Sequence, residues 1–194
     1  MKDLRTTVGI VAAANLAWFA IEFVVALDIK SVSLFADSVD FLEDAAVNLL
    51  ILIALAWSAR QRARVGMFLA GLLLLPALAF LWALWGKLTA PSVPAPLGLG
   101  LTGFGALVVN VCCAFLLARF RHHSGSLTKA AYLSARNDAV ANVAIIAAGL
   151  TTAVFHTIWP DVIVGIGIAI LNAGAAKEVW EAARNERGAA DPHA

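Results

Sequence analysis

Long apolar stretches alternate with short polar connections along the whole chain. Residues 65–86, 139–160 and 162–176 contain no charged side chain, and residues 88–118 are apolar but are divided by three prolines between positions 91 and 96. A helix needs about 20 mostly apolar residues to cross the hydrocarbon core of a bilayer, and proline does not continue a helix. The pattern therefore predicts six membrane-spanning helices, at residues 7–27, 33–58, 65–86, 97–118, 132–155 and 159–177.

Basic residues are concentrated on one side of these predicted spans. The connections on the opposite side contain only Lys30 and Lys87. Because short loops rich in Lys and Arg stay in the cytoplasm, both termini are expected to be cytoplasmic. Residues 1–177 would then form one six-span transmembrane domain, and residues 178–194 a short charged cytoplasmic tail. The residues on the basic side are Lys2, Arg5, Arg60, Arg62, Arg64, Arg119, Arg121, Lys129, Lys177, Arg184 and Arg187.

The composition agrees with a membrane protein. Of the 194 residues, 61% are hydrophobic and 14% are charged, whereas a soluble domain has roughly 45–50% apolar and about 25% charged residues. Lys and Arg number 14 against 13 Asp and Glu, so no basic excess exists to bind a nucleic acid. The fold class predicted is an all-α integral membrane bundle, multi-pass, surrounded by lipid, and placed in the cytoplasmic (inner) membrane.

The second predicted span contains a polar stripe in an otherwise apolar helix. Asp40, Asp44 and Asn48 recur every four residues, which places them on one face. Asp37 lies three residues before Asp40 and flanks the same face. Glu43 points in a different direction, toward another helix or the interface.

The fifth predicted span contains a second stripe of the same spacing. Ser134, Asp138 and Asn142 are again four residues apart. Asn142 is more typical of an interhelical hydrogen bond than of a metal ligand, as are Asn48 and Asn110. The adjacent Cys112 and Cys113 face different directions on a helix, which favours packing over metal binding.

The acidic residues inside the spans have too few basic partners. One carboxylate at membrane depth costs roughly 2.5–3.5 kcal/mol, so all six together would cost about 15–20 kcal/mol. Arg136 is expected to be the only basic residue inside the bundle and to extend toward the cytoplasm. Some of the acids could instead lie at water-filled ends or cap neighbouring helices; the others need water, protons or a cation from solution. The six are Glu22, Asp37, Asp40, Glu43, Asp44 and Asp138.

These stripes resemble the signatures of a known transporter family. Residues 31–44 are similar to the second-span signature of the cation diffusion facilitator family of divalent-metal transporters, where His or Asp is followed four residues later by Asp. Residues 132–143 resemble its fifth-span counterpart, and Trp159-Pro160-Asp161 resembles the start of its last span. The likeness extends over about residues 7–185, as for a short form without the cytoplasmic C-terminal domain of that family.

The resemblance implies a metal site between spans two and five. Its ligands would be Asp40, Asp44 and Asp138, with Ser134 at the position where the family has His or Asp. The fourth place could be taken by water or by Ser134, Asn137 or Asn142. Serine is a poor zinc ligand, and an all-oxygen set suits manganese, iron(II) or cobalt better than an imidazole site would. The residues expected to line the pathway or support the ligands are Asp37, Asn48, Asn137, Asn142 and Glu22.

The function implied is secondary active transport. A divalent metal ion would be the substrate and protons the counter-ion, with export from the cytoplasm, no permanently bound cofactor, and a homodimer formed through the transmembrane helices. A membrane-embedded metal-dependent phosphotransferase is an alternative, although such enzymes carry a Gly-rich, Arg-bearing stretch where this chain has Phe41-Leu42. A cation channel is a third reading.

Overall fold

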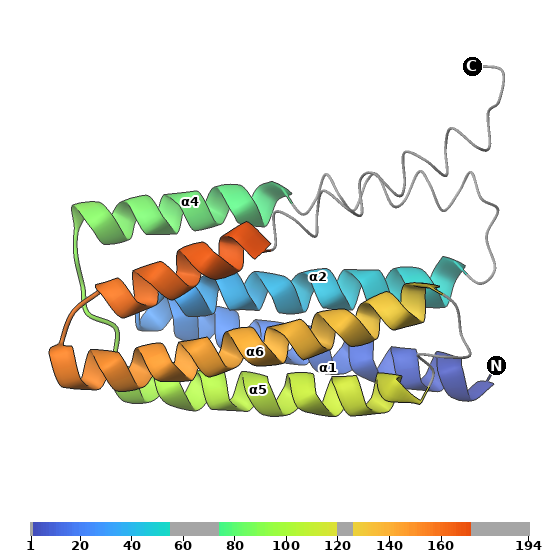
Figure 1. Ribbon diagram of the computed structural model, residues 1–194. Coiled ribbons are helices and arrows are strands. Elements are labelled where there is room, and N and C mark those ends of the chain that lie inside the picture. The colour runs from blue at the N-terminus through green and yellow to red at the C-terminus, as the bar shows by residue number, and fades with distance from the viewer. Residues whose placement is uncertain (1, 55–73, 120–125, 172–194) are drawn as a thin grey trace, which may run out of the picture.

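The computed structural model describes residues 2–54, 74–119 and 126–171. In these ranges the regular structure is entirely helical, without a strand. The elements are α1 (Lys2–Asp28), α2 (Val32–Ala54), α4 (Leu74–Thr89), α5 (Pro96–Ala118), α6 (Ser126–Phe155) and a helix at Trp159–Leu171 (Figure 1).

Most predicted span boundaries agree with the helices within a few residues. The largest difference is at α6, which begins at Ser126 and not at residue 132. Its first turns contain Ser, Thr and Lys, so the helix extends beyond the apolar segment from which the span was predicted. The predicted end of span two, the first part of span three, the end of span six and the tail at 178–194 lie outside the described residues.

The helices have the length and composition of a membrane protein. Leu4–Asp28, Pro96–Ala118 and Asn137–Phe155 are each long and apolar enough to cross a bilayer, and Trp159–Leu171 is apolar but shorter. Helix α2 has 23 residues, but its four carboxylates lower its hydropathy. Exposed Val, Leu and Phe side chains cover the outer faces of α1, α5 and α6, where they would contact lipid.

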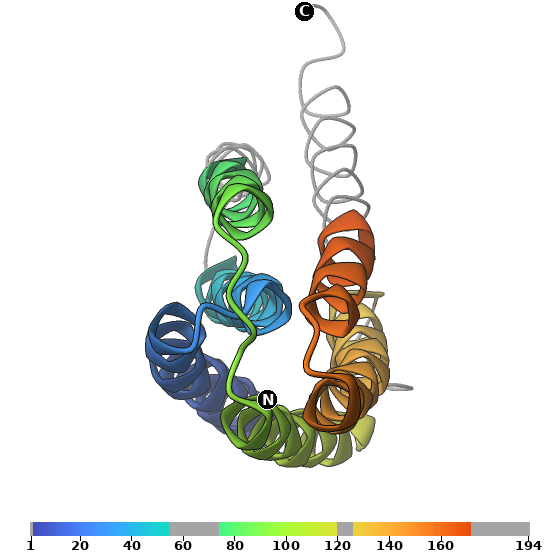
Figure 2. The same ribbon diagram turned by 90° about the vertical axis from the view of Figure 1, so that its left-hand side faces the viewer.

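Four helices lie side by side along the length of the molecule. Helix α1 packs along α2 and α5 along α6, and contacts of α1 with α5 and of α2 with α6 join the two pairs. Figure 2 shows α4 and the helix Trp159–Leu171 together on one side of these four helices. Helix α4 packs on α2.

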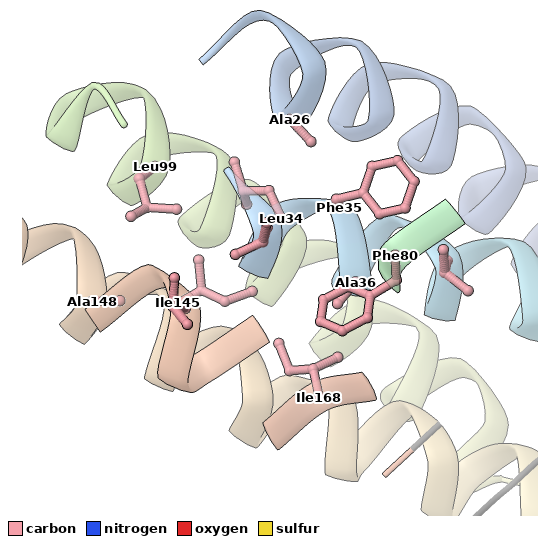
Figure 3. Close-up of a cluster of buried hydrophobic side chains, with 12 residues drawn as sticks. Ala26, Leu34, Phe35, Ala36, Phe80, Leu99, Ile145, Ala148 and Ile168 are labelled. Carbon is pink, nitrogen blue, oxygen red and sulfur yellow. The ribbon is translucent and has the colours of Figure 1, made fainter. Parts of the chain in front are cut away.

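Two apolar clusters form the core. The Leu34 cluster joins α1, α2, α4, α5, α6 and the helix Trp159–Leu171 through residues such as Ala26, Phe80, Leu99, Ile145 and Ile168 (Figure 3). The Val11 cluster, at the other end of the four-helix arrangement, consists of Val8, Val11, Cys113, Leu117 and Ala135.

Glycines allow two close helix contacts. A Cβ on Gly149 of α6 would lie 3.0 Å from the backbone nitrogen of Gly100 on α5. A Cβ on Gly165 would lie 2.9 Å from the backbone carbon of Val32, at the start of α2. Small residues of this kind let helix backbones approach each other in membranes.

Candidate cation site

A layer of polar side chains lies between the two apolar clusters. On α6, Asp138 and Asn142 come between Ala135 of the Val11 cluster and Ile145 of the Leu34 cluster. Helix α1 has its buried Asn15 and Glu22 at the same level, between Val11 and Ala26. The acids of α2 therefore meet polar groups from neighbouring helices in the middle of the bundle.

The structure brings Asp40 and Asp138 to facing sides of α2 and α6. Asp40 is half-buried, and the largest charge acting on its carboxylate is that of Asp138. The charges of Asp37, Glu43 and Asp44, all on the same helix as Asp40, act less strongly. One acid of each predicted stripe therefore lies close to an acid of the other.

The ligand set remains a prediction. Asp44 and Asp138 are half-buried, and Ser134 lies on α6 one turn before Asp138, but its side chain is outside the described part of the chain. Among the described residues, no three His, Cys, Asp or Glu side chains are grouped closely enough to hold a metal ion together.

A chain of hydrogen bonds joins α5, α6 and α2 beside these carboxylates. Asn110 Nδ2 donates to Asn142 Oδ1 at 3.0 Å, and Asn142 Nδ2 donates to Asp37 Oδ2 at 2.6 Å. All three side chains are buried. Asn142 is one turn after Asp138 and Asp37 is three residues before Asp40, so this chain fixes the register of the two helices that carry the predicted ligands.

The other residues expected near the pathway differ in position. Asn48 is buried and donates to the backbone carbonyl of Asp44 at 2.8 Å, so its amide nitrogen is used within α2. Asn137 is exposed. Glu22 is fully buried on α1, within hydrogen-bonding reach of Asp37.

A second polar cluster, around Asp161, lies at the Leu34 end of the bundle. The Asp161 carboxylate accepts hydrogen bonds from the hydroxyls of Ser31 at 2.6 Å and Ser33 at 2.7 Å. It also accepts from the backbone N–H groups of Val32 at 3.1 Å and Ser33 at 3.0 Å. These are the first N–H groups of α2, so Asp161 places its charge at the positive end of the helix dipole.

Lys87 completes this cluster. Its ammonium lies 3.2 Å from Asp161 Oδ2 and donates to the backbone carbonyl of Lys30, and both side chains of the ion pair are buried. Lys30 has a φ of 53° in the turn between α1 and α2. The ion pair therefore joins the end of α4, the α1–α2 turn and the start of the helix Trp159–Leu171.

Two expectations from the sequence are corrected by this cluster. Lys87 was expected in a connection, and Arg136 was expected to be the only basic residue inside the bundle. Lys87 instead lies in the last turn of α4 and is buried, because the Asp161 carboxylate compensates its charge. Two features of the sequence could have indicated this cluster. Ser31-Val32-Ser33 at the start of a span suits a helix N-cap, and Asp161 and Lys87 are predicted on the same side of the membrane.

The long apolar helices, with carboxylates and amides buried between them, are those of an integral membrane protein. A family model described as the cation efflux transmembrane domain matches residues 8–185. The chain therefore belongs to the cation efflux family, and the resemblance drawn from spans two and five is confirmed. Members of this family are transporters and not enzymes, so the chain is a metal cation efflux transporter. A search of the curated proteins returned no match.

Proposed function

We propose that this transporter exports a divalent transition-metal ion from the cytoplasm in exchange for protons. Asp40 and Asp44 on α2 and Asp138 on α6 would bind the ion, with Ser134 at the fourth position. The site is supported best by the proximity of Asp40 on α2 and Asp138 on α6, whose electrostatic interaction exceeds that of Asp40 with any acid on its own helix. Like charges held together in a bundle are stabilised by a cation or a proton between them.

Proton coupling follows from the chemistry of the ligands. A carboxylate binds metal only after it has lost its proton, so metal entry releases protons and proton entry weakens metal binding. In the proposed cycle, cytoplasmic metal binds the ionised carboxylates while the site is open to the inside. The bundle then opens outward, where protons displace the ion.

Transport by the purified protein in liposomes tests the site. Asp44→Ala is expected to reduce metal uptake, followed together with a trapped pH indicator, to the level of empty liposomes. Asp28→Asn is the control, because Asp28 is an exposed carboxylate at the end of α1. Full transport by the Asp44 variant would contradict the ligand assignment, and metal flux without proton movement would indicate a channel.

Metal choice tests the fourth position. We propose an oxygen-only site for manganese, iron(II), cobalt or zinc, since hydroxyl and carboxylate oxygens favour harder ions than imidazole does. Ser134→His is expected to shift preference toward zinc when zinc, cobalt, manganese, iron, nickel and cadmium are compared. Val140→His is the matched control, at an exposed position of the same helix. An equal shift in the Val140 variant, or no shift in the Ser134 variant, would contradict a ligand at position 134.

A further inference from the structure

Glu22 and Asp37 form a pair of carboxyls that lies next to the candidate metal site and outside its ligand set. Glu22 is on α1 and Asp37 on α2, and both side chains are fully buried. Their carboxyls are within hydrogen-bonding reach of each other. Asp37 is fixed by the hydrogen bond that its Oδ2 accepts from Asn142.

Three of the four carboxyl oxygens of this pair have no hydrogen-bond partner among the described residues. Neither oxygen of Glu22, nor Oδ1 of Asp37, receives a hydrogen bond from a donor in the described residues. The indole N–H of Trp18, one turn before Glu22, lies near the same carboxyl and has no partner among those residues either. Buried polar atoms without partners are rare because each costs about 1–3 kcal/mol, and more when charged.

One added proton would give the two carboxyls a hydrogen bond to each other. Two ionised carboxylates are both acceptors and repel each other, whereas a carboxylic acid donates to a carboxylate in a short, charge-assisted bond. We infer that Glu22 and Asp37 form a proton-binding site of their own, in which one proton is shared between α1 and α2. The resulting network runs from Glu22 through Asp37 to Asn142 and Asn110.

The shared proton is subject to the charges of the candidate metal site. Asp40 acts on Glu22, and Asp44 acts on Asp37. On the α6 side, Asp37 contacts the amide of Asn142, which in turn accepts from Asn110 on α5, and neither amide titrates. A divalent cation at Asp40 and Asp44 would offset the charges that hold the proton. Metal binding is therefore expected to favour its release.

Infrared spectroscopy of the metal-free protein in detergent tests the shared proton. A protonated carboxyl has a C=O stretching band, sensitive to deuterium exchange, that an ionised carboxylate lacks. The wild type is expected to show such a band at neutral pH, and Glu22→Gln and Asp37→Asn are each expected to lose the same component. Asp28→Asn, which changes an exposed carboxyl on α1, should keep it.

Two results would overturn the inference. One is a wild-type spectrum that lacks the band of a protonated carboxyl at neutral pH. This result is obtained from the wild type alone and does not depend on the folding of a variant. The other is a band that persists in both substituted proteins while circular dichroism and gel filtration match the wild type. Neither result depends on metal transport, so the shared proton can fail while the proposed function stands.

The link to metal is tested by repeating the spectra with Zn²⁺ and Mn²⁺, and this arm alone rests on the proposed function. In protein shown by equilibrium dialysis to bind the metal, the band is expected to titrate at lower pH than in metal-free protein. The same titration with and without bound metal would refute the linkage. Failure to bind either metal would count against the proposed function and not against the shared proton.

Discussion

The Asp161 carboxylate accepts hydrogen bonds from two hydroxyl groups and two backbone N–H groups, and it forms an ion pair with one ammonium group. All of these groups belong to other elements of the fold. Ser31 also accepts a hydrogen bond from the N–H of Leu34 at 3.1 Å, so it acts as the N-cap of α2 while donating to Asp161. A buried ion pair repays its desolvation only when further hydrogen bonds satisfy its remaining atoms. Here the start of α2 provides them.

Removing the charge of Asp161 should destabilise the protein strongly. Asp161→Asn leaves the Lys87 ammonium buried without its counter-charge, for which the expected loss is about 3–5 kcal/mol. The double variant Asp161→Asn, Lys87→Met should recover part of it, because the orphan charge is gone. Unfolding in detergent, followed by circular dichroism, measures both. A loss no larger than in Asp28→Asn would show that the pair contributes little.

Asn142 was expected to form interhelical hydrogen bonds more than to bind metal. In the structure it accepts a hydrogen bond from Asn110 on α5 and donates one to Asp37 on α2. Asn142→Ala should lower metal affinity by about 10–100-fold, as the loss of groups that orient metal ligands commonly does. Equilibrium dialysis with Mn²⁺ or Zn²⁺ measures the change. Thr151→Ala, which removes only a bond from an exposed side chain to its own helix, is the control. Unchanged affinity in the Asn142 variant would separate this hydrogen-bond chain from the ligands.

At the scale of helices, α6 and α5 approach each other through glycine. Gly149→Ala places a Cβ 3.0 Å from the backbone nitrogen of Gly100, and this backbone cannot move without moving α5. Overpacking of this kind lowers the free energy of unfolding by about 1–3 kcal/mol. Gly167→Ala is the matched control, since a Cβ there meets nothing within 4 Å. Thermal unfolding should be lowered by the first substitution and unchanged or raised by the second. Equal effects would refute a close contact at Gly149.

The sequence predicts the helices well and their long-range partners poorly. Hydropathy and proline place α5 and the start of the helix Trp159–Leu171 almost to the residue, because both signals are local. The four-residue spacing likewise predicts that Asp40 and Asp138 face inward. The pairing of Lys87 with Asp161 depends on how separate spans pack, and the spacing of residues within one span does not predict that packing. Glu22 was recognised as unusual, but its proximity to Asp37 required the packing of α1 on α2.

Over the whole molecule, polarity is inverted relative to a soluble protein. Among the described residues, buried acids and amides such as Glu22, Asp37 and Asn142 lie inside the bundle, and large apolar side chains cover the outside of α1, α5 and α6. Lipid accepts the outer surface without cost, whereas each inner charge needs a partner. The polar layer around Asp138 and Asn142 therefore lies between the two apolar clusters.

A charge on the outer surface should be tolerated only where that surface leaves the lipid. Val143, on the exposed face of α6, lies within the apolar segment Asn137–Phe155, and Val143→Arg is expected to cost about 2.5–3.5 kcal/mol on insertion. Val93 has similar exposure, 45% against 54%, but lies in the connection between α4 and α5, so Val93→Arg should have little effect. The yield of folded protein in the membrane fraction compares them. Equal yields would mean that the outer face of α6 does not contact the lipid core.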